Sequence, residues 1–102
     1  MDPIFDTQAP ELRELCRSFH VQRLEVFGSA LRTDFDPMRS DLDFLVVFGP
    51  LPPGAYSHNY FGLMDALEQL FQRPVDLVVG PAIRNPYFRE SIERSKALLY
   101  AA

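Results

Sequence analysis

Cysteine, lysine and long apolar runs are scarce in this sequence. Cys16 is the one cysteine among 102 residues, which excludes an internal disulfide framework and leaves the role of a small core residue. The longest apolar run, Phe44–Phe48, is far too short to span a bilayer. The acidic N-terminus has no basic segment followed by an apolar one, so we see no secretory signal. We expect a cytoplasmic protein with no membrane partner.

Positive charge is also sparse. The formal net charge is −4, and the ten basic residues are nine arginines and Lys96. Non-specific binding to nucleic acid depends on clustered Lys and Arg, so direct nucleic-acid binding is disfavoured. A hydrophobic content of 47% argues against disorder, and 102 residues suffice for one core. We expect a single domain over residues 1–102.

Apolar periodicity predicts three helices and three strands. The helices are Pro10–Phe19, Tyr56–Gln72 and Pro86–Arg94, and the strands are Val21–Gly28, Asp41–Phe48 and Val75–Val79. The tail KALLYAA fits either an extension of the last helix or a short edge strand. The order α-β-β-α-β-α predicts an α+β fold, a small mixed sheet flanked by helices.

Three aspartates interrupt the two most hydrophobic strands. Because strand side chains alternate, Asp41 and Asp43 point to one face. If the strand that contains Asp76 pairs beside them, one face carries three carboxylates. Three anions need a cation to sit together, and Mg²⁺ prefers hard oxygen ligands.

Gly28-Ser29 ends the preceding strand and could form a phosphate-binding turn beside such a site. Gly28 lets a phosphate approach the backbone, and Ser29 would open a turn with free N–H groups. A Gly-Ser pair alone is usually a turn, and an Asp-x-Asp alone is usually a surface feature. Together with the third aspartate they favour phosphoryl or nucleotidyl transfer with two metal ions.

These motifs resemble the minimal nucleotidyltransferases of the DNA polymerase β-like superfamily, of the MNT antitoxin type. The signature is Gly-Ser, a loop and Asp-x-Asp, here Gly28-Ser29 and Asp41-Leu42-Asp43, within the texts SDLDFLVVF and RPVDLVV. The resemblance covers about Leu12 to Tyr100. It implies ATP as substrate and Mg²⁺ as cofactor.

The resemblance also implies residue roles. Asp41, Asp43 and Asp76 would be metal ligands, and Asp76 would help to deprotonate the attacking hydroxyl. Nucleotide binding would fall to Gly28 and Ser29, which would hold the triphosphate, and to Arg32, which would make a further phosphate contact. Two departures affect the loop after Ser29. It has eleven residues before Asp41, one more than expected, and it lacks one basic residue and one glycine of the family pattern.

Family members of this size resemble antitoxins encoded beside a small helical HEPN toxin. The resemblance implies transfer of AMP from ATP to a tyrosine of that toxin. The altered loop motivates an alternative, an antitoxin that acts by binding alone. A transferase acting on a small molecule or a nucleic-acid end is a third hypothesis, disfavoured by the net charge and the single domain.

A lone domain of this kind needs an exposed face for its partner. Phe61 and Tyr87 are aromatic residues outside the predicted apolar stripe and are candidates for such a contact, although ordinary packing is the commoner role. Small domains often dimerise, and the tail is one place for a homo-oligomer contact.

Overall fold

Four helices and four strands follow one another in the part of the chain that the structure describes. This computed structural model describes residues 3–28, 41–80 and 84–102. In chain order the elements are α1 (Ile4–Thr7), α2 (Ala9–Ser18), β1 (Val21–Phe27), β2 (Leu42–Phe48), α3 (Tyr56–Phe71), β3 (Val75–Val79), α4 (Pro86–Ser95) and β4 (Ala97–Ala101).

The strands form one mixed sheet in the order β3-β2-β1-β4. Strand β1 is antiparallel to both of its neighbours, β2 and β4. Strands β2 and β3 are parallel, so the chain must cross over between them, and α3 makes that crossover. The predicted α+β class and mixed sheet are confirmed.

The larger hydrophobic core lies between the sheet and the helices α1, α2 and α3. Alternate residues of β2, namely Leu42, Phe44 and Val46, are fully buried on this face. From α3, Leu63 and Leu67 are equally buried against them, at the spacing of one helical face. This core fixes the position of β2, the strand that contains Asp43.

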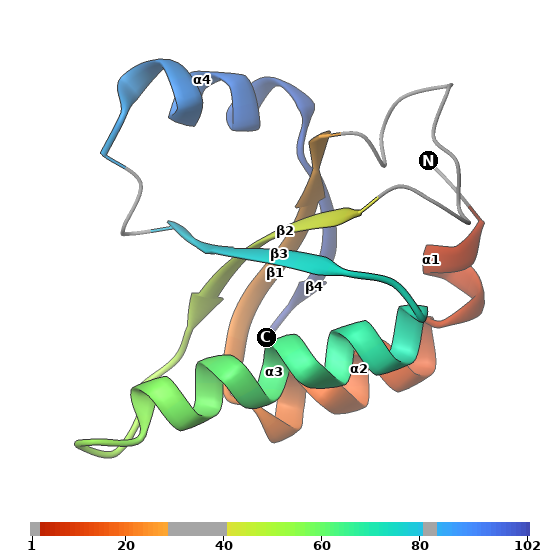
Figure 1. Cartoon of the computed structure of the whole chain (residues 1–102), viewed down its shortest axis with the longest axis vertical. Helices are drawn as coiled ribbons and strands as arrows, with labels where there is room; N and C mark the ends of the chain where they lie inside the picture. The colour runs from red at the N-terminus through yellow and green to blue at the C-terminus, as the bar shows by residue number, and fades with distance from the viewer. Residues whose placement is uncertain (1–2, 29–40, 81–83) are drawn as a thin grey trace.

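A smaller core lies on the opposite face of the sheet, under α4. It consists of Phe27 from β1, Leu45 from β2 and Ile92 from α4, with Val78 of β3 packed against them. Figure 1 shows α2 and α3 side by side on one side of the sheet and α4 on the other. Asp43, two residues before Leu45, therefore lies on the face that α4 covers.

The predicted order of helices and strands is confirmed, with one addition at each end. The tail that fits a helix or a strand forms β4, paired with β1. The short helix α1 is an addition that the sequence pattern does not predict; it buries Phe5 against the rings of Phe44 and Phe71. Strand β2 begins at Leu42, so Asp41 immediately precedes it. Within the described ranges, no helix has the length and apolar character needed to cross a membrane.

Candidate active site

Two of the three predicted carboxylates lie on neighbouring strands at the same level. Asp43 of β2 and Asp76 of β3 are direct partners in the parallel register. Partner residues of adjacent strands are about 4.8 Å apart at their Cα atoms and point to the same face. Asp76 is exposed and Asp43 is half-buried, so both are accessible to a ligand on the α4 side of the sheet.

Gly28 packs against the carboxylate of Asp43. Phe27, the residue before it, pairs with Asp43 across β1 and β2. A Cβ atom at position 28 would lie 2.6 Å from Oδ2 of Asp43, and the φ of Gly28 is +73°. The close approach and the left-handed backbone both require glycine here. The glycine of the Gly-Ser pair thus shapes the space around a candidate metal ligand.

Asp41 lies at the mouth of β2, one residue before the strand begins, and is exposed. Among the described residues, no three acidic, histidine or cysteine side chains lie close enough together to hold a metal ion as they stand. The donor set still suits Mg²⁺, because Asp43 and Asp76 are neighbouring hard oxygen donors and Asp41 is two residues from Asp43. The chemistry of these oxygen donors therefore suits a magnesium ion. Ser29 and Arg32, the other two predicted phosphate contacts, lie outside the described residues.

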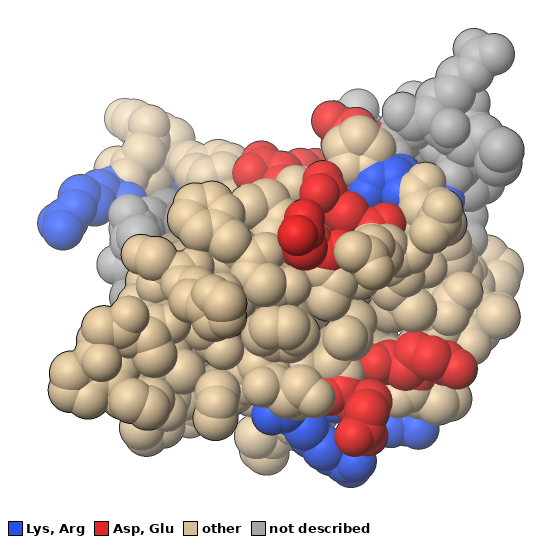
Figure 2. Space-filling view, turned by 60° about the horizontal axis from the view of Figure 1, so that its bottom comes forward, with Lys and Arg blue, Asp and Glu red and all other residues tan. Residues whose placement is uncertain are grey.

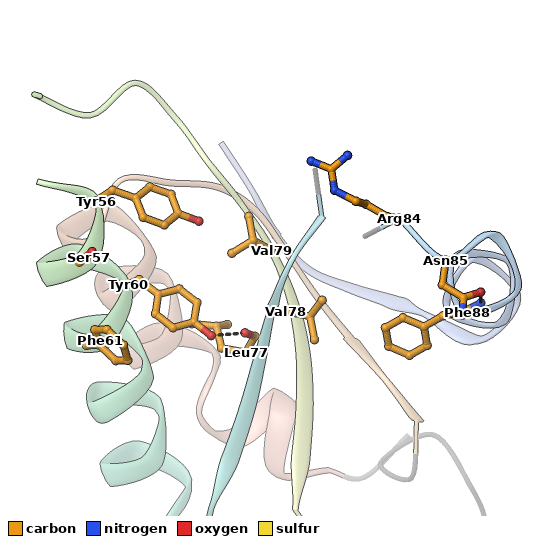
Figure 3. A pocket seen from close by; sticks show the side chains of 10 residues that line it. All are labelled: Tyr56, Ser57, Tyr60, Phe61, Leu77, Val78, Val79, Arg84, Asn85 and Phe88. Atoms are coloured by element: carbon orange, nitrogen blue, oxygen red, sulfur yellow. Dashed lines mark hydrogen bonds between the residues drawn. The ribbon is translucent and has the colours of Figure 1, made fainter. Parts of the chain in front are cut away.

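An apolar groove of about 610 Å³ lies at the β3 edge of the sheet. Figure 3 shows its two walls, α3 with Tyr56 and Tyr60 on one side and the start of α4 with Phe88 on the other. The floor is β3, whose Val78 points towards Phe88 and whose Val79 points towards Tyr56. The sequence does not predict this groove, because its residues come from three separate elements.

The hydroxyl of Tyr60 donates a hydrogen bond to the carbonyl oxygen of Leu77 across the groove floor. Burial raises the pKa of Tyr60, and the nearby charge of Asp76 and then Tyr56 raise it further. The phenol therefore stays protonated at neutral pH and remains a donor. The charge of Asp76 thus acts on a tyrosine that lines the groove.

Glu25 is a second buried charge, and the sequence pattern does not single it out. It lies in the middle of β1, is 3% exposed, and has its two carboxylate oxygens near Arg23 at 3.1 Å and Lys96 at 3.3 Å. The only signal in the sequence is an acidic residue in a strand that is otherwise apolar at its centre. Its partner Lys96 is far along the chain, so the pairing follows only from the fold.

Cys16 is a core residue, as expected. It is fully buried in α2, and burial raises the pKa of its thiol to about 12. A thiol with that pKa is protonated at neutral pH and does not act as a nucleophile.

Comparison with known proteins adds to this geometry. Residues 10–99 match the family described as nucleotidyltransferase domain. The chain belongs to this family. It is an enzyme of the nucleotidyltransferase class, and a nucleoside triphosphate is the substrate that this class implies.

One relative is a protein of Methanocaldococcus jannaschii named "Putative protein adenylyltransferase MJ0128". It is 38% identical over 79 residues, which cover 78% of this chain and 76% of the relative. A solved structure described as "Structure of putative minimal nucleotidyltransferase" is 30% identical, has a TM-score of 0.68, and is matched over 95% of both chains. The predicted membership of the minimal nucleotidyltransferases is confirmed.

A third similar structure is a complex of a tri-AMPylated HEPN toxin from Shewanella oneidensis with an MNT antitoxin. It is 17% identical with a TM-score of 0.65, and the match covers 96% of this chain and 73% of the other. At that identity the likeness establishes the fold. The same sheet and helices thus occur in a protein that assembles with a HEPN toxin.

Proposed function

We propose that this nucleotidyltransferase transfers AMP from ATP to a tyrosine hydroxyl of a HEPN-type toxin, and so acts as the antitoxin of a HEPN/MNT pair. The observation that carries the proposal is the parallel register that pairs Asp43 with Asp76, with Gly28 against Asp43. The name of the archaeal relative and the toxin complex among the similar structures support protein as the acceptor.

In this proposal Asp41, Asp43 and Asp76 would hold Mg²⁺, whose positive charge would offset the negative charge of the phosphates. Gly28 and Ser29 bind the triphosphate, with a further contact from Arg32. The tyrosine oxygen forms a bond to the α-phosphorus as the bond from that phosphorus to the bridging oxygen breaks. Pyrophosphate leaves, and Asp76 accepts the proton of the hydroxyl, so the products are the adenylylated tyrosine, pyrophosphate and a proton.

The test is the intact mass of the HEPN-type protein encoded beside this chain, after co-expression with wild type or with Asp43→Asn. Asp65→Asn is the matched control, because Asp65 is an exposed aspartate on α3, outside the candidate site. Loss of a group that only orients a metal ligand costs about 10- to 100-fold, so loss of a ligand itself should slow transfer about 100-fold or more. We expect added AMP with wild type and Asp65→Asn only.

An unmodified toxin that wild type and Asp43→Asn neutralise equally well would contradict adenylylation. It would establish the alternative, an antitoxin that masks the toxin by binding alone. AMP found instead on RNA or on a small molecule would move the chain to the third class. Thermal unfolding of each variant checks that the substitution has not unfolded the chain.

A further inference from the structure

The groove along β3 is lined mainly by apolar and aromatic side chains. Of the described residues that line it, only Arg84 is charged. Several of the other side chains are large aromatics that solvent reaches, with Phe61 62% exposed, Tyr56 47% and Phe88 44%. Figure 2 shows a broad area of uncharged side chains on one face of the molecule, with acidic side chains above it and to its right. Exposed apolar area of this kind marks a binding surface.

Part of the outer edge of β3 is already hydrogen-bonded, so a further strand could not pair with all of it. On its outer side the carbonyl of Leu77 accepts a hydrogen bond from Tyr60, and the N–H of Val75 donates to Glu68 at 3.0 Å. Both partners are α3 side chains. These two backbone groups are therefore not available to a ligand strand, which favours recognition through side chains over strand addition.

The position of the groove suits the acceptor side of a phosphoryl transfer. Gly28, Asp43 and Asp76 lie in a row across β1, β2 and β3. In an in-line displacement the attacking and leaving oxygens are on opposite sides of the phosphorus. If pyrophosphate is held at the Gly28 end of this row, the attacking hydroxyl arrives from the β3 end.

The groove begins at that end. Val78, on its floor, is two residues after Asp76 and points to the same face of β3, so their Cα atoms are roughly 6.5 Å apart. Phe88, which packs edge-on against Phe27, forms the wall on the α4 side. A tyrosine in the groove would have its ring among apolar side chains and its hydroxyl towards Asp76. This division suits an aromatic side chain with a polar tip.

We infer that the groove between α3 and α4 binds the tyrosine-bearing segment of the acceptor protein, with the phenol ring against Val78 and Phe88 and an acidic neighbour of the tyrosine near Arg84. This inference rests on the proposed function, since it assigns the acceptor side of the same site. Arg84 is the one charge among the described lining residues, and beside apolar side chains it favours a segment that is apolar and acidic. A second copy of this chain and the base of the nucleotide are the competing occupants.

The first experiment titrates N-acetyl-tyrosinamide into the isotope-labelled full chain and follows the amide NMR signals, with and without a non-hydrolysable ATP analogue and Mg²⁺. We expect the signals of Val78, Val79 and Phe88 to shift with the tyrosine amide. The same signals should not respond to the ATP analogue alone. Shifts confined to other residues, or groove shifts caused by the analogue, would overturn the inference.

The second experiment compares Phe61→Ser with Tyr87→Ser. Both side chains are exposed aromatics, at 62% and 81%, but Phe61 lines the groove and Tyr87 does not. Burial of a phenylalanine contributes about 1.5–3 kcal/mol, so the KM for the toxin should rise about 10-fold or more with Phe61→Ser. It should stay within about 2-fold of wild type with Tyr87→Ser, and the Kd for the ATP analogue should not change in either.

Equal KM values in the two variants would overturn the inference. So would a dimer of the wild type that Phe61→Ser converts to a monomer, because a second copy would then be the occupant. Failure of the proposed function is distinguishable. A toxin that wild type leaves unmodified contradicts adenylylation, whereas the tyrosine amide titration reports on the groove without any catalysis.

Discussion

Gly28 is the residue with the most restricted choice of side chain in the candidate site. Its φ of +73° disfavours any residue with a Cβ, and a Cβ there would meet the Asp43 carboxylate at 2.6 Å. The two restrictions have different consequences. Backbone strain lowers stability, while the contact displaces a proposed metal ligand.

We expect Gly28→Ala to lower both stability and transfer activity. Gly54→Ala is the matched control, because Gly54 has a φ of +80° and a Cβ added there would have nothing within 4 Å. The strain should cost about 1–2 kcal/mol in each variant. Chemical denaturation measures that loss, and the rate of AMP transfer should fall only with Gly28→Ala. Equal activities in the two variants would mean that the carboxylate moves aside at no cost to function.

Several residues of the candidate site can be predicted from the sequence alone. Asp43 and Gly28 are found because strand alternation and the end of an apolar run are local signals. Their contact is not predictable in this way, because it depends on the register between β1 and β2. Glu25 escapes prediction for the same reason, since only the fold shows that an acidic residue in β1 meets Lys96.

At the level of single elements, Lys96 connects the end of α4 to the middle of β1. Its ammonium group lies 3.3 Å from the buried carboxylate of Glu25 and 3.0 Å from Glu93. Hydrogen bonding to Glu93, and then to Glu25, raises the pKa of Lys96, so the group stays charged. These ion pairs fix the junction between α4 and β4.

We expect Lys96→Met to reduce the free energy of unfolding by about 1–3 kcal/mol, because it removes one of the two cations, Lys96 and Arg23, that pair with the buried Glu25. Arg94→Met is the control. Arg94 pairs with Glu90 on the exposed face of α4, one turn away, and such a pair contributes about 0.5 kcal/mol or less. Urea denaturation of both variants measures the difference. A loss from Arg94→Met as large as that from Lys96→Met would show that burial of Glu25 does not matter.

The helices and strands differ in how well the sequence predicts them. Helix α3 is predicted closely because its buried residues recur at helical spacing and Pro74 follows its end. The tail that forms β4 fits two structures, since a short, half-buried edge strand has no strong periodicity. Pairing with β1 decides between them, and that contact is distant in sequence. The short helix α1 depends likewise on burial of Phe5 against β2 and α3.

For the molecule as a whole, the two faces of the sheet are packed unequally. The core on the α2–α3 side contains most of the buried apolar residues, whereas the α4 side has Phe27, Leu45 and Ile92. Ile92 is the one buried residue of α4. Stability within a protein follows such differences, and poorly packed elements open first.

We expect α4 to open locally without unfolding of the sheet. Its amides should exchange with solvent faster than those of β2 and α3 in a native-state hydrogen-exchange experiment. Ile92→Ala should accelerate exchange in α4 more than in β2. In contrast, Leu63→Ala, in the larger core, should lower protection throughout, at a cost of about 2–5 kcal/mol. Amides of α4 that are as protected as those of β2 would show that the helix and sheet unfold together.

The overall class of fold is predictable, because apolar periodicity identifies the elements and their order limits the arrangements. The groove is not. It depends on how far apart α3 and α4 lie, and no local sequence pattern encodes that separation. Phe61 and Tyr87 are equal candidates for a partner contact in the sequence, and only the structure separates them, since Phe61 lines the groove.

The contact between Gly28 and Asp43 has a consequence for the interpretation of genomes. The aspartates alone would mark a homologous gene as encoding an active enzyme. Any side chain at the position of Gly28 meets the carboxylate of Asp43, so such a homologue would keep the aspartates and lose their arrangement. We expect proteins of that kind to be pseudoenzymes, whose contribution to the cell depends on binding alone.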